Sequence, residues 1–417
     1  MRATVSSPFK CDEKHTTLFE EVDPYNPQNT VRGYINRRQG HHYGSLYITH
    51  VNGKPCTQVI PSAPKQGYPF DRDGNWEWPS YDTIEAYEKL DGTCIIAYSY
   101  IDACGDSYQT YKTRLRPFLG EGTYGNFKSL WDEMLTKYPG MVGMHSDFSD
   151  YVFVYELYGK RNHHLIVYDV SLDTRLLFTR LTDCPYHLET LDVWASIATT
   201  YGIPSVAQML CLTGPVENLD EVYLEQQQLM SDSFPTVEIP VEDEDEELPT
   251  SIGELDGIEG QVWYFVHSKG HVIASTQVKN KPPEVLNYHW KVVGRDGKPK
   301  IPFVSIYTTI VNSLENTDEP DYEFVKQLLM EEFPEDMVER ARNKIEKTIK
   351  QVLFDKKTTR EIIEEYKRVR TDAFNLNTAR GAVMQKFAKD FCDSESDRKK
   401  MGSKIFNTLL AYEEGLL

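Results

Sequence analysis

The chain has 417 residues, 40% of them hydrophobic, and a formal net charge of −19 at pH 7. This length allows two domains and a large core. No apolar run approaches the roughly 20 residues that cross a bilayer, and residues 1–17 lack the apolar stretch of a secretion signal. The seven cysteines form no C-x-x-C pair, which argues against a zinc site or a disulfide scaffold and fits a reducing cytosol.

The negative charge is unexpected for a protein that holds nucleic acid mainly through phosphate contacts, because such proteins are usually basic. Part of the charge is one acidic run at 242–247. We interpret this run as a solvated loop. The alternative is an acidic gate that repels nucleic acid from the wrong face.

Residues 1–305 predict a mixture of α and β structure. Six segments rich in β-branched and aromatic residues predict strands, at 44–51, 94–101, 151–158, 165–171, 261–267 and 271–278. Two segments between them predict helices, at 126–137 and 188–201. The Pro- and acid-rich residues 229–257 predict a surface loop.

After about Tyr307 the strand-like runs end. Apolar residues recur there at spacings of three and four, which predicts a helix face packed on a core, at Val338, Ala341, Ile345, Ile349 and Val352. Pro334, followed by two acidic residues, predicts a helix start. The segment 358–361 fits a capping box that would begin a further helix. These features predict a separate all-helical domain at 315–417 and therefore an α+β protein.

The candidate chemistry begins with Lys89-Leu90-Asp91-Gly92, just before the apolar run 94–100. Nucleotidyltransferases use a lysine followed two positions later by Asp-Gly to present an amine to the α-phosphate of a nucleotide. The attacking amine must be neutral, so we expect the site to lower the lysine pKa from about 10.4 by burial or nearby cations. About one chain in ten of this length carries the pattern by chance, so an ordinary surface lysine is the alternative.

Glu156 interrupts the otherwise aromatic and aliphatic strand candidate 151–158. By the alternation of a strand it shares a face with Val152, Val154 and Tyr158, where a carboxylate needs a partner or a cavity. We interpret it as a ligand of ribose hydroxyls or an outer-sphere contact of a metal. The alternative is an ion pair with Arg161 or with another structural base.

The segments 261–267 and 271–278 predict a hairpin closed by the three residues 268–270. In that register Glu259 lies opposite Lys279, and Lys281 follows on the same face. A metal-binding carboxylate and two phosphate-binding cations would then line one patch. The alternative is an exposed cross-strand salt bridge.

Four histidines and two arginines are further candidates. The pairs His163-His164 and His267/His271 lack a third spaced metal ligand, so we interpret them as structural or RNA-contacting. Arg114 and Arg116 suit contact with phosphate or RNA, because guanidinium matches phosphate geometry. Ordinary surface arginines are an equally good interpretation.

Together, the elements EKLDGTC, YELYGKRNHHLIVY, EGQV and VKNK resemble the covalent nucleotidyltransferase superfamily, and within it the phage-type RNA ligase 1 family. The resemblance covers about 90–281. It implies that Lys89 is the catalytic lysine that becomes lysyl-AMP, and that Glu156, with Asn162, contacts the ribose of ATP. It also implies that Glu259 binds Mg²⁺ or Mn²⁺, and that Lys279 and Lys281 bind the phosphates and assist catalysis.

Upstream of Lys89, the family has an Arg-Gly element and a Lys-Phe-Phe-Asn-like segment. Arg32, in TVRGYI, is the candidate for the first, with Arg38 as a weaker one. Lys65, in PKQGY, is the candidate for the second. Arg32, Lys65 and Arg114 complete the predicted nucleotide-binding set.

The resemblance implies an adenylyltransferase domain at 1–305 with mostly antiparallel sheets, followed at 315–417 by a helical RNA-specificity domain. The implied activity is that of an ATP-dependent RNA ligase, which joins 5′-phosphate and 3′-hydroxyl ends through lysyl-AMP and adenylylated RNA in the repair of RNA, such as nicked tRNA. We expect a monomer without a membrane segment, acting in the cytoplasm, or in the host cytoplasm if the source is a virus. The alternatives are an mRNA-capping guanylyltransferase, a DNA ligase and a non-catalytic RNA-binding protein.

Overall fold

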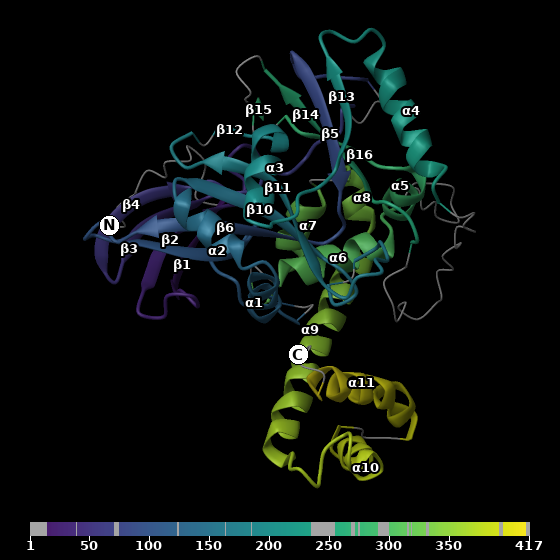
Figure 1. Ribbon diagram of the computed structural model, residues 1–417. Helices are drawn as coiled ribbons and strands as arrows, with labels where there is room; N and C mark the ends of the chain where they lie inside the picture. The colour runs from purple at the N-terminus through teal and green to yellow at the C-terminus, as the bar shows by residue number, and fades with distance from the viewer. Residues whose placement is uncertain are drawn as a thin grey trace, which may run out of the picture. The chain divides into compact units, whose positions relative to one another are not determined.

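The computed structural model (Figure 1) describes most of the chain. The described residues are 15–38, 40–70, 75–122, 125–162, 164–184, 186–234, 255–267, 272–273, 276–290, 300–314, 317, 319–330, 333–391 and 395–413. The chain divides into two compact units, one formed by 1–120 and 127–288, the other by 121–126 and 289–417. The predicted boundary at 305–315 therefore falls inside the second unit.

Three antiparallel sheets form the first unit. The first has the order β1-β2-β3-β4, with β1 (Thr16–Val22), β2 (Thr30–Asn36), β3 (Leu46–Val51) and β4 (Lys54–Ile60). The second has the order β11-β10-β6-β7, with β11 (Asp173–Leu181), β10 (Tyr151–Tyr158), β6 (Thr93–Ile101) and β7 (Ser107–Thr113). The third has the order β12-β15-β14-β5-β13, with β16 beside β14; its strands are β12 (His187–Leu188), β15 (Val272–Ile273), β14 (Gly260–Val266), β5 (Thr83–Lys89), β13 (Gln208–Thr213) and β16 (Val278–Asn280).

Helices cover the outer faces of the second and third sheets. On the second sheet, α1 (Phe127–Lys137) and α2 (Gly140–Asp147) place Trp131 and His145 against the ring of Tyr155, with centroids 5.4 and 5.6 Å away. On the third sheet, α4 (Leu219–Ser231) packs Tyr223 against Trp263 at 5.5 Å. The unit also contains α3 (Leu191–Thr200), and α5 (Pro283–Trp290) crosses its boundary.

The faces that these helices leave uncovered meet each other in the first unit. Phe178 of β11 contacts Tyr264 of β14 edge to face, with centroids 6.3 Å apart. By strand alternation, Glu156 lies on the inner face of the second sheet and Lys89 on the inner face of the third. The candidate site therefore lies between these two sheets.

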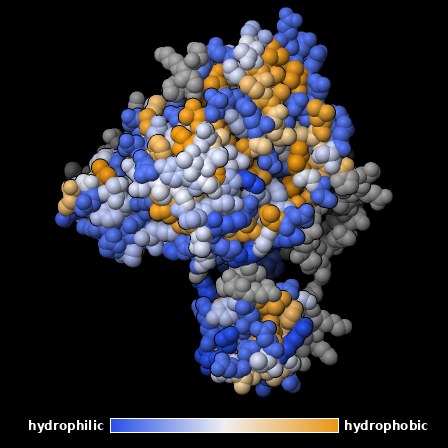
Figure 2. Space-filling model, in the orientation of Figure 1, coloured by the Kyte–Doolittle hydropathy of each residue, from blue (hydrophilic) through white to orange (hydrophobic). Residues whose placement is uncertain are grey.

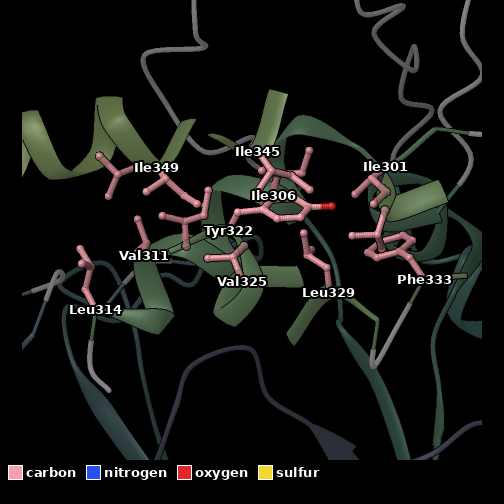
Figure 3. Packing of buried hydrophobic residues seen from close by; sticks show 13 residues of the cluster. Ile301, Ile306, Val311, Leu314, Tyr322, Val325, Leu329, Phe333, Ile345 and Ile349 are labelled. Carbon is pink, nitrogen blue, oxygen red and sulfur yellow. The ribbon is translucent and has the colours of Figure 1, made fainter. Parts of the chain in front are cut away.

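The second unit is helical apart from the short pair β8 (Glu121–Gly122) and β9 (Gly125–Asn126). Its helices are α6 (Phe303–Ser313), α7 (Tyr322–Leu329), α8 (Glu335–Arg340), α9 (Arg342–Val369), α10 (Arg380–Phe391) and α11 (Glu395–Glu413). The predicted apolar stripe packs in the core shown in Figure 3, where Ile345 and Ile349 of α9 meet Ile306 of α6 and Val325 of α7. The second half of α9 forms another core with α10 and α11.

The predicted α+β fold is confirmed: antiparallel sheets are followed by an all-helical region. Two element predictions are wrong. Residues 165–171 form no strand, because the backbone N–H groups of Leu165 and Ile166 donate to the Asp91 carboxylate instead of to a ladder. No helix begins at the predicted capping box, because α9 runs through it and Thr358 donates to the Phe354 carbonyl one turn back.

The other predicted strands and helices agree with the structure within a few residues, with two exceptions. The segment 271–278 is divided between β15 and β16, and the apolar stripe is divided at Ala341 between α8 and α9. Most of the predicted loop 229–257, with its acidic run 242–247, lies outside the described residues. Within the described part of the chain, no helix is long and apolar enough to cross a membrane. Figure 2 shows hydrophilic and hydrophobic side chains mixed on the visible face, with apolar ones gathered over β13 and α4, where Met209, Leu224 and Leu229 are exposed.

Candidate active site

The Lys-x-Asp-Gly motif forms the turn that joins the two facing sheets. Lys89 ends β5, and β6 begins at Thr93. Asp91 fixes the turn: its Oδ2 accepts the backbone N–H groups of Leu165 at 2.5 Å and Ile166 at 2.8 Å. At Gly92 any side chain would collide with β10, because its Cβ would lie 2.2 Å from the carbonyl oxygen of Leu157. The fold thus explains why the motif contains both Asp and Gly. The turn that they form holds Lys89 at the end of its strand.

Lys89, Glu259 and Lys281 form a charge cluster in which Glu259 and Lys281 are buried and Lys89 is partly buried. Lys89 Nζ lies 2.5 Å from Glu259 Oε2, and Lys281 Nζ lies 2.7 Å from Glu259 Oε1. Glu259 is only 4% exposed. Burial alone would raise its pKa, but the two ammonium groups outweigh burial and hold the pKa of Glu259 at about 2. Glu259 in turn raises the pKa of Lys281 above its ordinary value despite burial. Glu259 and Lys281 are therefore placed to be charged at neutral pH.

The predicted hairpin register is correct at one end and wrong at the other. Val266 pairs with Val272, as predicted. Between β15 and β16 the chain turns, since the Thr276 N–H donates to the Ile273 carbonyl, and the pairing resumes three residues further along. Lys279 therefore lies opposite Val262, and Lys281 rather than Lys279 meets Glu259. The two lysines do share one face, as predicted.

The segment that carries Lys65 pairs with β16, which carries Lys279, and the sequence did not predict this pairing. Gly67 bonds to the residues on either side of Val278: its N–H donates to the Gln277 carbonyl, and its carbonyl accepts the Lys279 N–H, each at 3.0 Å. The Lys279 ammonium lies 4.3 Å from the ring centroid of Tyr68. Lys65 is two residues before Gly67, so this segment lies beside the lysine-bearing strand. Tyr68 was not among the predicted site residues. The only signal near it in the sequence is a second aromatic residue, Phe70, two positions later.

Glu156 lies on β10 opposite Cys94 of β6. Burial raises its pKa to about 8; the nearby Glu259 and Asp91 also raise it, while Lys89 and Arg114 lower it. Glu156 is therefore mostly neutral at pH 7 and can both donate and accept hydrogen bonds. The alternative pairing with Arg161 is not formed, because Arg161 pairs with Glu133 at 2.5 Å.

The other predicted residues divide into those near the cluster and those elsewhere. Arg114 interacts electrostatically with Glu156, and this carboxyl together with Cys94 and Tyr43 raises the pKa of Arg114 against the effect of burial. Arg32 is half exposed on β2, 3.9 Å from the Glu20 carboxylate, in the first sheet rather than in the two sheets that carry Lys89 and Glu156. Asn162 stabilises the turn that follows β10, where its side-chain amide donates to the Leu157 carbonyl at 2.6 Å.

The remaining candidates give no sign of a histidine metal site. Arg38 is exposed on the loop after β2. The ring of His164 approaches the Thr93 hydroxyl at 3.3 Å, while His163 and His271 lie outside the described residues. In the described ranges, no group of three or more His, Cys, Asp or Glu side chains could hold a metal ion.

The donor set nevertheless fits one kind of metal. Mg²⁺ keeps several of its waters and is bound in nucleotide sites by one or two carboxylates together with substrate phosphates. Glu259, which is ionised, supplies such a carboxylate, and Lys279 and Lys281 share the face on which phosphates would have to lie. The site thus fits a divalent cation that arrives with a nucleotide rather than one held in a protein cage.

Comparison with solved structures found weak similarity to ligases. An archaeal ATP-dependent RNA ligase (form 2) is 11% identical with a TM-score of 0.40, over 96% of this chain and 93% of that chain. A putative ATP-dependent DNA ligase from Aquifex aeolicus is 12% identical with a TM-score of 0.39, over 92% and 86%. No family model and no curated protein sequence matches the chain. At these TM-scores the similarity carries no argument about function, which has to come from the side chains of the site.

Proposed function

We propose that this protein is an ATP-dependent RNA ligase that works through a lysyl-AMP intermediate on Lys89. The observation that carries the proposal is the buried cluster of Lys89, Glu259 and Lys281 at the Lys-x-Asp-Gly turn. Three charged side chains from distant parts of the sequence would be costly to bury for stability alone. Their types and order are those of the nucleotidyltransferase resemblance, which supports an amine nucleophile beside a phosphate-binding patch.

The reaction would proceed in three phosphoryl transfers. The Lys89 ammonium leaves Glu259 and loses a proton to solvent. Its Nζ then bonds to the α-phosphorus of ATP as the bond to the β-phosphate oxygen breaks and pyrophosphate departs. An oxygen of an RNA 5′-phosphate then bonds to the AMP phosphorus, and the P–N bond to Lys89 breaks. Finally an RNA 3′-hydroxyl attacks the activated 5′-phosphorus, loses its proton and expels AMP.

The surrounding side chains have roles that follow from their charge. Lys281 and Lys279 would offset the negative charge that moves onto the leaving phosphates in each transfer. Glu156, mostly neutral at pH 7, would hydrogen-bond a ribose hydroxyl, and Lys65 and Arg114 would contact phosphate. Glu259 would hold Mg²⁺ or Mn²⁺, which when bound stabilises charge on the reacting phosphoryl group.

The second unit would bind the RNA. Basic residues outnumber acidic ones over 342–413, although the whole chain carries a net charge of −19. Several of them are exposed along α9, namely Lys357, Arg360, Lys367 and Arg368. Such a surface suits a phosphate backbone. A role in tRNA repair, a cytoplasmic location and action as a monomer remain predictions from the sequence.

The proposal is tested by ligation of labelled strands. An RNA with a 5′-phosphate and a 3′-hydroxyl, incubated with ATP and magnesium, should give joined strands or circles with the wild type and none with Lys89→Ala. The same strand without its 5′-phosphate is the control and should not react. Joining of DNA but not RNA would replace the RNA ligase with a DNA ligase, and the absence of joining with either strand would contradict the proposal.

A further inference from the structure

The inner face of the third sheet carries three rows of paired residues that lead away from the charge cluster. Lys89 pairs with Gly260, Tyr87 with Val262 and Glu85 with Tyr264. Val262 also pairs with Lys279 of β16. Directly paired residues point to the same face of a sheet, and residues two apart along a strand do so as well. The first row thus holds the nucleophile, and the second holds a phosphate-binding candidate.

Gln277 completes the third row. The register of β14 and β16, continued by one residue, places Gln277 beside Tyr264. The backbone at this position is held, because its carbonyl accepts the Gly67 N–H at 3.0 Å. Gln277 is two residues from Lys279 and four from Lys281. At about 3.3 Å per residue, its side chain therefore lies on the same face at a distance that suits the base of a nucleotide whose phosphates lie at the lysines.

The side chain of Gln277 is buried but has no hydrogen-bond partner. It is 2% exposed, and neither Oε1 nor Nε2 has a partner among the described residues. Buried polar groups in native proteins are nearly always paired, so such an amide needs an explanation. Gln261, a buried glutamine on the opposite face of the same sheet, shows the ordinary case: its amide oxygen accepts the Trp263 indole N–H at 2.9 Å and its nitrogen donates to Gln226 at 3.2 Å.

We propose that Gln277 binds the adenine edge of the nucleotide and sets the preference for ATP. An amide presents one acceptor beside donors, which matches the 6-amino group and N7 of adenine. On the same edge guanine presents O6 next to N7, two acceptors, and does not match this arrangement. This inference rests on the proposed function for its nucleotide.

The test combines a residue deletion with a ligand deletion. Gln277→Met keeps the size of the side chain and removes its polar atoms. Adduct formation is measured with ATP and with purine riboside triphosphate, which lacks the 6-amino group. The wild type should prefer ATP by about 10-fold. The variant should use the two nucleotides within about twofold of each other, because the group that reads the amine is gone.

Stability separates this role from a structural one. Because Gln277→Met removes unpaired buried polar atoms, its Tm should equal or exceed that of the wild type. The matched control Gln261→Met removes paired atoms, so its Tm should fall while its preference for ATP stays at the wild-type level. An unchanged preference in Gln277→Met, or an equal loss in the control, would overturn the inference.

A binding measurement separates the inference from the proposed function. Calorimetry with AMP and purine riboside monophosphate, on Lys89→Ala with and without Gln277→Met, requires no adduct. A Gln277-dependent preference for AMP, with no adduct in the wild type, would support base reading and overturn the ligase. An adduct in the wild type without such a preference would support the ligase and overturn base reading by Gln277. A protein that binds neither nucleotide would also overturn the inference.

Discussion

Glu259 is the side chain on which the charges of the site converge. One carboxylate holds two ammonium groups, while the neighbouring Glu156 is mostly neutral at pH 7 because its pKa is raised to about 8. The cluster is therefore locally positive in a chain whose net charge is −19. This local excess of cations explains how an acidic protein could bind a triphosphate, and it makes the separate roles of the two lysines measurable.

Replacing Lys281 should cost more stability than replacing Lys279. Lys281→Met leaves Glu259 buried with one cation fewer, which should lower the free energy of unfolding by about 3 kcal/mol. Lys279→Met removes the cation from the face of the Tyr68 ring, an interaction worth about 1 kcal/mol. Urea unfolding measures both. Equal losses, or a larger loss for Lys279→Met, would favour the register predicted from the sequence over the one in the structure.

Glu156 predicts a pH dependence of stability. Its pKa is raised on folding from an ordinary 4.5 to about 8, mainly by burial, so the folded protein holds a proton that the unfolded chain releases. The associated stability is fully present below pH 4.5 and is lost as the pH rises to about 8. Glu156→Gln removes this dependence. Its Tm relative to the wild type should rise by roughly 3 °C or more between pH 5 and pH 8, whereas a constant difference across that range would show that Glu156 is not buried in a neutral form.

Among the helices and strands, features formed by neighbouring residues were predicted from the sequence. Pairings between segments that are far apart in the chain were missed. The motif at Lys89, the strand around Glu156 and the helical stripe on α9 carry their signal within a few residues. The shift between β15 and β16 depends on a turn near Thr276, and the pairing of Gly67 with β16 joins segments far apart in the chain. Gln277 could not be singled out from the sequence, because its lack of partners is visible only in the fold.

A substitution at Gly260 tests the pairing of β14 with β16. Its φ is +151°, and a Cβ there would lie 2.2 Å from the Asn280 carbonyl oxygen of β16. Gly260→Ala should therefore separate β14 from β16 and draw Lys281 away from Glu259, with a loss of stability of about 3 kcal/mol and a loss of adduct formation. Gly381→Ala in α10, where nothing lies within 4 Å, is the control. It should leave adduct formation unchanged and should not lower stability, because Ala favours a helix over Gly. A stable, active Gly260→Ala would show that the close pairing is not needed.

At the scale of the whole molecule, charge is divided unequally along the chain. The first unit carries the reactive cluster, and the second, with two hydrophobic cores of its own, carries an excess of basic residues over 342–413. Adenylylation and RNA binding would thus be separable by mutation. That separation is expected if the helical unit acts on the substrate rather than on the nucleotide.

Charge reversal on α9 tests this division. Lys357→Glu combined with Arg360→Glu should weaken binding of single-stranded RNA about 10-fold or more at low salt. The slope of log affinity against log salt should decrease by about 0.7 for each phosphate that the variant no longer neutralises. Fluorescence anisotropy measures the binding, and adduct formation should remain at the wild-type rate. Lys54→Glu, an exposed lysine of β4, is the control; equal weakening by this variant would indicate a general charge effect.

Formation of a covalent adduct tests whether Lys89 is the nucleophile. Purified protein is incubated with magnesium and α-labelled ATP or GTP and run on a denaturing gel, beside Lys89→Arg, which keeps the charge, and Lys160→Ala, which removes an exposed lysine. We predict a label from ATP in the wild type and in Lys160→Ala, and none in Lys89→Arg. A label from GTP alone would indicate a guanylyltransferase, and a label that persists in Lys89→Arg, or no label in folded protein free of bound AMP, would contradict Lys89 as the nucleophile.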